Sequence, residues 1–418
     1  PQPTPHSAHP VNDTADQEDT PSQIPHDQAL LGINHTISIG DRNLTPTALS
    51  YATLRTVTRF CHSADPTLTH RHVPRLRGLE DPDHHHEFAT HIAPFARKAW
   101  ADLQHPDDGA VRFEHDHYLK MWSLTDPTLR TDFLLLDEAQ DTNPVVEHVF
   151  NRQRDHAQLV MVGDSAQAIY QWRGAKDVMS GFGGTHLALS QSFRFGPHLA
   201  TEANRWLTLA DASLRLTGTP AVPTELGPVQ QPDAVLCRTN VGAMTQVMHL
   251  LHAGARVALA GGGAGLRALA LAADDLKAGR RTHHPELVLF ATWSDLQEYA
   301  AHDPAGCDLQ PFVDLVDTHG TVSILAAVAQ LTPEQHAQVT VSTAHKSKGR
   351  EWERVRIADD FNPPRDTRDE TGQLVPGPID PTEARLAYVA VTRTRTRLDL
   401  GGLSWVKQHL QGQPDEPH

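Results

Sequence analysis

Two short apolar runs that lead into acidic residues constrain the fold of this 418-residue chain most strongly. The first, Phe133–Leu136, leads into Asp137 and Glu138. The second, residues 159–162, leads into Asp164 after one glycine, and a helix-like stretch separates the two runs. Continuous apolar runs of this length are typical of buried parallel strands, and two strands joined through a helix form a β-α-β unit. The sequence therefore predicts an α/β protein with a parallel sheet.

Apolar periodicity divides the rest of the chain into further helices and strands. Between Ala29 and about Leu129 the apolar residues recur mostly at helical spacing, with loops such as residues 78–86. The later elements are a predicted strand at Ala234–Cys237, a largely helical stretch at about 266–331, a strand at 338–342 and a helix at 381–392. These elements predict a second α/β region, followed by a frayed terminus.

The overall charge does not exclude a nucleic-acid partner. The formal net charge is −15, but residues 1–28 contain no Lys or Arg and almost no large apolar residue, so we expect a disordered tail there. Setting aside the acidic residues of both ends leaves the body at about −8. Those residues are Asp13, Asp16, Glu18, Asp19, Asp27, Asp415 and Glu416. Local basic patches decide binding to phosphates more than the total charge does.

The cysteines and the apolar runs favour a cytoplasmic protein. Cys61, Cys237 and Cys307 are far apart and lack the spacing of a metal or disulfide framework, so we expect reduced thiols. No apolar run is long enough to span a bilayer, and the polar start does not resemble a secretory signal. The sequence therefore predicts no membrane partner.

The acidic residues after the first strand have the pattern of a nucleotide-hydrolysing site. A strand that delivers Asp and Glu at its C-terminal end can place a Mg²⁺ ligand beside a carboxylate that activates water. Asp137 would hold Mg²⁺, and Glu138 would orient and deprotonate the attacking water. An isolated match of this kind is also compatible with a strand end that carries solvated acids.

The residues after the second strand add a phosphate sensor and a DNA contact. Gln167 lies just past the strand end, where an amide can sense the γ-phosphate of a nucleotide. Tyr170, Trp172 and Arg173 follow, and an aromatic residue beside an Arg suits stacking on a single-stranded base next to a backbone contact.

Together these segments resemble a known enzyme family. Residues 137–141, Asp-Glu-Ala-Gln-Asp, and residues 163–175, with the pattern Gly-Asp-x-x-Gln-x-Ile-Tyr-x-Trp-Arg-Gly-Ala, resemble motifs II and III of superfamily 1 helicases of the UvrD/PcrA/Rep group. The resemblance implies two RecA-like parallel-sheet domains of the P-loop NTPase type with helical accessory subdomains. It also implies ATP and Mg²⁺ as cofactors and single-stranded DNA as partner.

Three further segments are similar to the later motifs of the family, in the expected order. In residues 189–195, similar to motif IV, Phe193 would lie against the adenine and Arg194 would reach the γ-phosphate. Residues 341–352 are similar to motif V: there Thr343 and His345 would contact the DNA backbone, and Gly349 and Glu351 would face the nucleotide. In residues 383–393, similar to motif VI, Arg393 would be the arginine finger.

Two segments resemble one subgroup, the F-box DNA helicases and their bacterial relatives. These are residues 115–124, before motif II, and residues 191–196. No F-box is recognisable. The implied division is a tail at 1–28, a helical accessory region at 29–130, the second half of the first RecA-like domain at 131–195, the second RecA-like domain at 196–405 with a reduced insertion at about 266–335, and a tail at 406–418.

One departure from the family concerns the loop that binds phosphates. The family pattern Gly-x-x-x-x-Gly-Lys-Thr is absent from the sequence, and the glycine cluster at 261–265 lacks the Lys and the Ser or Thr. ATP would then be held by the second domain and by Asp137, Gln167 and Arg194. The strand beside Phe133–Leu136 would also be missing, which would expose an edge of the sheet. We expect a truncated or degenerate copy of a helicase, in preference to a chain that pairs with a separately encoded N-terminal half.

Clustered histidines raise the alternative of a metal site. His84, His85 and His86 lie near His70 and His72 in the sequence, but without cysteines or ordered carboxylates a solvated loop is favoured. The resemblance implies a structural turn at residues 114–117.

The resemblance implies an ATP-dependent helicase that moves 3′-to-5′ on single-stranded DNA and acts in DNA repair or recombination. Its Trp172 would step along the bases while the lobes open and close. The alternative is an inactive remnant that binds single-stranded DNA or a protein partner.

Overall fold

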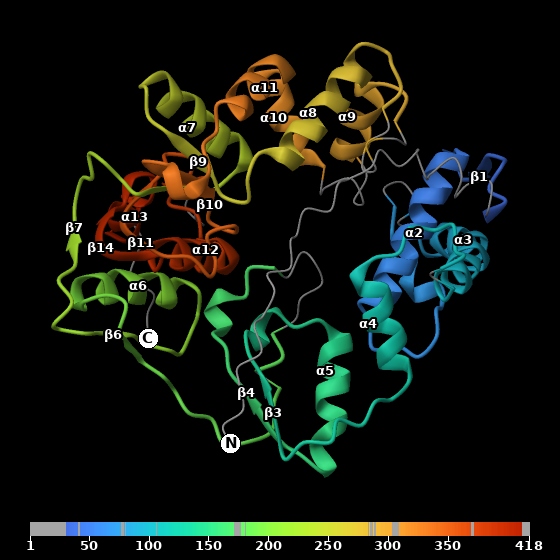
Figure 1. The fold of residues 1–418 in the computed structure, drawn as a ribbon, viewed down its shortest axis with the longest axis horizontal. Coiled ribbons are helices and arrows are strands. Elements are labelled where there is room, and N and C mark those ends of the chain that lie inside the picture. The colour runs from blue at the N-terminus through green and yellow to red at the C-terminus, as the bar shows by residue number, and fades with distance from the viewer. Residues whose placement is uncertain are drawn as a thin grey trace, which may run out of the picture.

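The elements form three groups in the computed structural model (Figure 1). The described residues are 31–40, 42–76, 79, 81–105, 107–170, 177–179, 181–282, 284, 287, 290–302, 309–368 and 372–411. A mainly helical group, formed by the first described elements of the sequence, lies at the right of the view. A small α/β group lies at the bottom. A larger α/β group and its covering helices occupy the left and the top.

The helical group is built around two long helices that pack against each other and a hairpin. Its elements are β1 (Ile37–Ile39), β2 (Arg42–Leu44), α2 (Pro46–Cys61), η1 (His70–His72), α3 (Pro82–Leu103) and α4 (His115–Leu124). The hairpin, formed by β1 and β2, was not predicted. Both long helices begin at a side-chain cap followed by proline: Thr45 accepts from the backbone N–H of Ala48, and Asp81 accepts from that of Asp83.

Two predictions for this group were wrong. His84, His85 and His86 belong to the first turns of α3 and not to a loop, because Asp81 caps the helix and Pro82 starts it. His115 is the first residue of α4, so the segment expected to be a turn is already helical. Within the described residues, no group of three or more His, Cys, Asp or Glu side chains could hold a metal ion.

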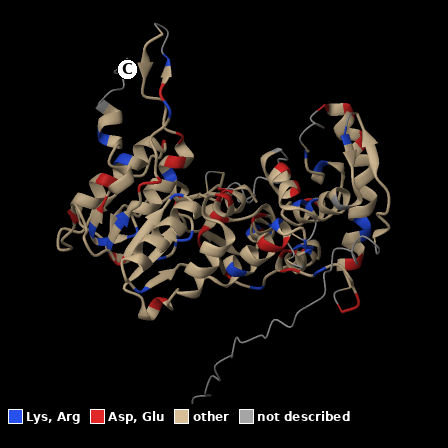
Figure 2. Cartoon of the chain, turned by 90° about the horizontal axis from the view of Figure 1, so that it is seen from above, with Lys and Arg blue, Asp and Glu red and all other residues tan. Residues whose placement is uncertain are grey.

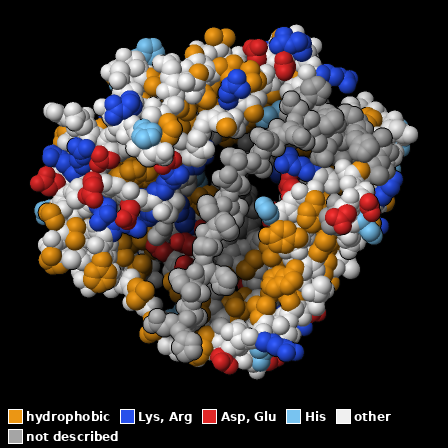
Figure 3. All heavy atoms as spheres, in the orientation of Figure 1, with side chains coloured by type: hydrophobic (Ala, Val, Ile, Leu, Met, Phe, Trp, Pro, Cys, Tyr) orange, Lys and Arg blue, Asp and Glu red, His pale blue; other side chains and the backbone are white. Residues whose placement is uncertain are grey.

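The small α/β group confirms the predicted β-α-β unit. Strands β3 (Phe133–Leu136) and β4 (Gln158–Met161) pair in parallel, with α5 (Pro144–Asn151) between them in the sequence. The prediction that β3 is a buried strand was wrong, however, because the side chain of Phe133 is 58% exposed and that of Leu135 is 67% exposed. Figure 3 shows hydrophobic side chains gathered at the surface over the neighbouring α4 and α5.

The larger α/β group contains a six-stranded parallel sheet. Its strand order is β7-β14-β11-β8-β10-β9, and every pairing is parallel. The strands are β7 (Glu225–Leu226), β8 (Ala234–Cys237), β9 (Val257–Leu259), β10 (Val339–Thr343), β11 (Trp352–Ile357) and β14 (Thr394–Asp399). Strands β8 and β10 are buried along their whole length, as expected for central strands covered on both faces.

Helices cover both faces of this sheet and form two separate hydrophobic cores. One core contains residues of α6 (Pro197–Leu209), α12 (Pro381–Val391) and α13 (Val406–Gln411). The other contains residues of α7 (Asn240–His252), α8 (Ala264–Lys277), α9 (Trp293–His302), α10 (Gln310–His319) and α11 (Thr321–Ala329). Short pairs β5 (Gln191–Ser192) with β6 (Thr217–Gly218) and β12 (Thr367–Arg368) with β13 (Leu374–Val375) lie outside the main sheet.

The predicted strand at Ala234–Cys237 and the predicted helix at 381–392 are confirmed, the helix ending one residue earlier. The C-terminal end differs from the predicted tail, because α13 begins at Val406, whose side chain is fully buried. None of the described helices is long and apolar enough to span a membrane by itself. Helices α10 and α11 reach the length and hydropathy of a membrane span only when they are taken together, and they are bent by 92° with respect to each other.

Charges of both signs are interspersed over the molecule when it is seen from above (Figure 2). One basic side chain is buried in the helical group. The ammonium of Lys120 donates to the backbone carbonyls of Ser63 at 2.7 Å and Asp65 at 2.6 Å, and it lies 4.3 Å from the centre of the Phe60 ring. Burial lowers the pKa of Lys120 from 10.5 to about 8.

The titration of Lys120 should make stability depend on pH. Its pKa is lower in the folded chain than in the unfolded chain, so between about pH 8 and 10.5 the unfolded chain binds more protons and stability rises with pH. From about pH 8 to about pH 10, the wild type should gain about 2 kcal/mol in free energy of unfolding relative to Lys120→Met. Urea unfolding of both proteins measures this gain, and parallel pH curves would contradict the burial of a charged Lys120.

Candidate active site

The loop after β3 presents two carboxylates at the C-terminal end of the strand. Glu138 has backbone angles φ 50° and ψ 40°, a left-handed conformation that is uncommon for a residue other than glycine. The side-chain amide of Gln140 donates to Glu138 Oε2 at 2.5 Å, and Asp137 Oδ1 accepts from the backbone N–H of Glu138 at 2.9 Å. Both carboxylates are exposed to solvent. The loop therefore holds them in place without burying them.

Asp164, after β4, connects the small α/β group with the large one. Its Oδ2 accepts from the side-chain amide of Gln167 at 2.9 Å and from the hydroxyl of Tyr388 on α12 at 2.8 Å. Burial and the neighbouring Asp164 carboxylate raise the pKa of Tyr388, so its hydroxyl remains a donor. Gln167 thereby lies at the boundary between the two groups.

Arg393 lies at the end of α12 and faces the same boundary. Its side chain is only 2% exposed and donates to the carbonyl of Val389 at 2.9 Å and to the hydroxyl of Thr392 at 3.0 Å. Its Nη2 lies 3.4 Å from Gln167 Oε1. Burial and the charge of Arg194 lower the pKa of Arg393 to about 10. No ion pair joins Arg393 to a carboxylate within the described part of the chain, although the charges of Asp164 and Glu138 act to raise its pKa.

Arg194 approaches the same region from the segment before α6. Its Nη1 donates to the carbonyl of Thr392 at 3.1 Å, and its Nε pairs with Glu351 at 2.5 Å. Arg395 lies 3.4 Å from the same carboxylate. The adjacent Phe193 is 77% exposed, so its ring is free to cover a planar ligand. The predicted nucleotide residues Phe193, Arg194 and Glu351 therefore lie together.

Lys348 was not predicted as a site residue, although it belongs to a segment that resembles a helicase motif. Its ammonium pairs with Asp141, donates to the carbonyl of Gln167 at 2.9 Å and lies 3.6 Å from Glu138 Oε2. Tyr388 and Asp164 were also missed. A sequence signal was present, because all these residues lie inside the segments that were matched, but their partners are distant in the sequence.

The residues predicted to contact DNA differ from one another in their burial and in their hydrogen bonds. The hydroxyl of Tyr170 donates to the backbone carbonyl of His345 at 2.7 Å, and the two rings lie 6.2 Å apart. Thr343 is buried, and its hydroxyl accepts from the backbone N–H of Lys346 at 3.3 Å. Gly349 has φ 77° in the turn that follows. Trp172 and Arg173 lie outside the described residues.

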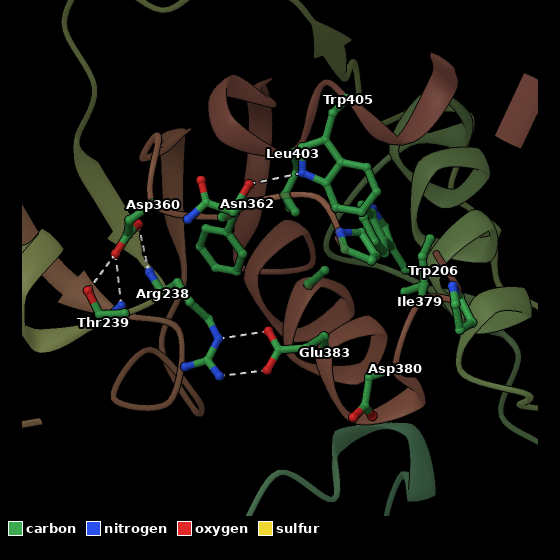
Figure 4. A pocket seen from close by; sticks show the side chains of 14 residues that line it. Trp206, Arg238, Thr239, Asp360, Asn362, Ile379, Asp380, Glu383, Leu403 and Trp405 are labelled. Carbon is green, nitrogen blue, oxygen red and sulfur yellow. Dashed lines mark hydrogen bonds and ion pairs between the residues drawn. The ribbon is translucent and has the colours of Figure 1, made fainter. Parts of the chain in front are cut away.

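A pocket of about 430 Å³ lies elsewhere, beside the N-terminal end of α12 (Figure 4). Trp206 and Trp405 form part of its wall. Arg238 donates to both carboxylate oxygens of Glu383 at 2.6 and 2.7 Å, and Asp360 accepts from the hydroxyl of Thr239 at 2.9 Å. Because these polar groups satisfy one another, the pocket presents mainly apolar walls.

Comparison with known proteins agrees with this geometry. Residues 118–179 match the UvrD/REP helicase N-terminal domain, and residues 314–405 match the UvrD-like helicase C-terminal domain. In these two segments the chain is similar to UvrD/REP helicases. Of the segments that resemble helicase motifs, motifs V and VI lie wholly in the second match, whereas the segment around Arg194 lies between the two matches.

The curated relatives are DNA helicases, and the homology is distant. "F-box DNA helicase protein 1" of Schizosaccharomyces pombe is 28% identical over 398 residues, which cover 85% of this chain and 44% of the relative. "F-box DNA helicase 1" of Gallus gallus is 26% identical over 339 residues, which cover 72% of this chain and 32% of the relative. The chain thus spans less than half the length of these relatives.

The residues at the end of β3 fit a magnesium ion at Asp137. Mg²⁺ prefers oxygen ligands and is usually bound by one or two carboxylates together with substrate phosphates and water. The exposed carboxylate of Asp137 accepts one backbone hydrogen bond, which leaves lone pairs for a metal. Asp137 would hold the ion, and Glu138 beside it would be near the ion's water ligands.

The neighbouring charges of Arg194 and Arg393 predict an anion site. Inorganic tripolyphosphate should raise the unfolding temperature of the wild type by about 2–4 °C, because an anion bound between the two guanidinium groups would relieve their repulsion. The shift should be largely lost in Arg194→Gln. Differential scanning fluorimetry measures it.

The matched control is Arg354→Gln, because Arg354 forms an exposed pair with Asp233 away from the site. Equal shifts in Arg194→Gln, Arg354→Gln and wild type would contradict an anion site at Arg194.

Proposed function

We propose that this chain is an ATP-hydrolysing DNA motor of the UvrD type that moves 3′-to-5′ on single-stranded DNA in repair or recombination. The observation that carries the proposal is the convergence of Glu138, Gln167 and Arg393 at the boundary of the two α/β groups. Gln167 lies 3.4 Å from Arg393, and both belong to segments far apart in the sequence. A site divided between two lobes lets nucleotide binding and release change their relative position.

The proposed chemistry follows from the place of each side chain. Glu138 would orient and deprotonate the attacking water, while Mg²⁺ held by Asp137 would neutralise charge on the phosphates. Arg194 and Arg393 would stabilise the negative charge that grows on the transferred phosphoryl group. Phe193 would lie against the adenine, since its ring is exposed. Glu351 would release Arg194 when the nucleotide arrives, because the two are paired in this structure.

The DNA would lie over the residues that follow β4 and β10. Tyr170 and His345 meet there, and Thr343 is in the same turn region. Trp172 and Arg173, which lie outside the described residues, are kept in the proposal as a base-stacking residue and a backbone contact. Their support is the sequence pattern of an aromatic residue beside an arginine.

The two α/β groups are proposed as a tandem pair of RecA-like domains, the first of them incomplete. The exposed faces of Phe133 and Leu135 support this, because a two-stranded sheet with apolar residues in solvent is a fragment of a larger one. The same observation favours a second candidate function. In that case the chain would bind single-stranded DNA or a partner, such as a segment that carries the phosphate-binding loop, and would hydrolyse no ATP by itself.

ATP hydrolysis by the purified chain, with and without oligothymidylate, distinguishes these candidates. We expect DNA-stimulated hydrolysis that falls by a factor of about 100 or more in Glu138→Gln. Glu225→Gln, which changes an exposed carboxylate on β7, is the matched control and should retain the wild-type rate.

The other outcomes are equally informative. Binding of oligothymidylate without hydrolysis would support the second candidate. Hydrolysis that Glu138→Gln leaves unchanged would refute the assigned site.

A further inference from the structure

Lys348 connects the catalytic carboxylates with the large α/β group. It lies in the turn between β10 and β11, whereas Asp141, Glu138 and Gln167 belong to the small α/β group. Its side chain is only 9% exposed. A buried ammonium is stable only when its donors meet acceptors, and here it donates to the Asp141 carboxylate and to the backbone carbonyl of Gln167, with the Glu138 carboxylate 3.6 Å away.

The carboxylate of Asp141 depends on this contact. Its Oδ2 pairs with Lys348, while its buried Oδ1 has no hydrogen-bond partner among the described residues. Removing the ammonium would leave a half-buried carboxylate without a counter-charge, next to Glu138. Because Glu138 Oε2 lies 3.6 Å from the ammonium of Lys348, that charge acts on where the carboxylate rests.

The same ammonium contacts the side where DNA is proposed to bind. Lys348 Nζ lies 5.7 Å from the centre of the Tyr170 ring. The hydroxyl of Tyr170 donates to the carbonyl of His345, three residues before Lys348 in the same turn. The ammonium of Lys348 thus lies between the Tyr170–His345 contact and the carboxylate of Glu138.

We propose that Lys348 is a positioning residue through which single-stranded DNA on Tyr170 and His345 fixes the carboxylate of Glu138 for hydrolysis. This inference rests on the proposed function. DNA bound to the Tyr170–His345 contact would immobilise the turn and keep Lys348 on Asp141. Glu138 would then be held where it can accept the proton of the attacking water, so hydrolysis would increase when DNA is bound.

Kinetics of Lys348 variants test the catalytic part. Lys348→Met, which keeps the length of the side chain without its charge, should lower the DNA-stimulated kcat by a factor of about 100 and change the KM for ATP much less. Lys348→Arg should recover most of the stimulation, because the positive charge returns. Lys407→Met on α13 removes an exposed charge far from the site and should behave as wild type. A purely structural role of Lys348 would instead lower the basal and the stimulated rates by equal factors.

A second measurement tests the DNA coupling without requiring hydrolysis. Reductive methylation followed by mass spectrometry reports how accessible each lysine is. Oligothymidylate should slow the labelling of Lys348 severalfold and leave that of Lys407 unchanged, while Asp141→Asn should speed the labelling of Lys348 in the free protein. Bound DNA with unchanged labelling of Lys348 overturns this inference alone. Failure of the chain to bind oligothymidylate, measured by fluorescence anisotropy, overturns the proposed function together with it.

Discussion

The arrangement of the candidate site depends on polar contacts that join the small α/β group to the end of helix α12. The hydroxyl of Tyr388 donates to Asp164, a residue 224 positions away in the sequence, and Asp164 also holds the amide of Gln167. Since Tyr388 is buried, the loss of this bond would leave polar groups without partners inside the molecule. Arg393, in the turn that follows this helix, faces Gln167. The positions of Gln167 and Arg393 and the relative position of the two groups are therefore linked through the same few side chains.

A second consequence concerns electrostatics. Arg194, Arg393 and Lys348 bring three positive charges to a boundary that also holds the carboxylates of Glu138, Asp141, Asp164 and Glu351. Arg393 has no carboxylate partner within the described residues, and Arg194 is held by Glu351. Such a site is suited to an anionic ligand that brings its own negative charge. A chain with a net charge of −15 can thus contain a local site for a polyphosphate.

Local patterns were sufficient to predict the strands that are buried in the middle of the sheet. Ala234–Cys237 is apolar throughout, and the structure buries all of it. The pattern could not show that Phe133 and Leu135 are exposed, because burial depends on what packs against a strand. The start of α3 was missed for a different reason: histidines gave the segment a polar character, while the cap at Asp81 determined the helix. Lys348 was missed because its partners are tertiary, and sequence spacing carries no information about them.

The central claim is that ATP binds where the two α/β groups meet. Photolabelling with ATP that carries an azide on the adenine tests it most directly, since the label marks the residues next to the base. We predict that labelling falls on the peptide that contains Phe193 and disappears when unmodified ATP is in excess. Labelling confined to the pocket beside Trp206 and Trp405, or labelling that ATP does not compete with, would contradict the claim.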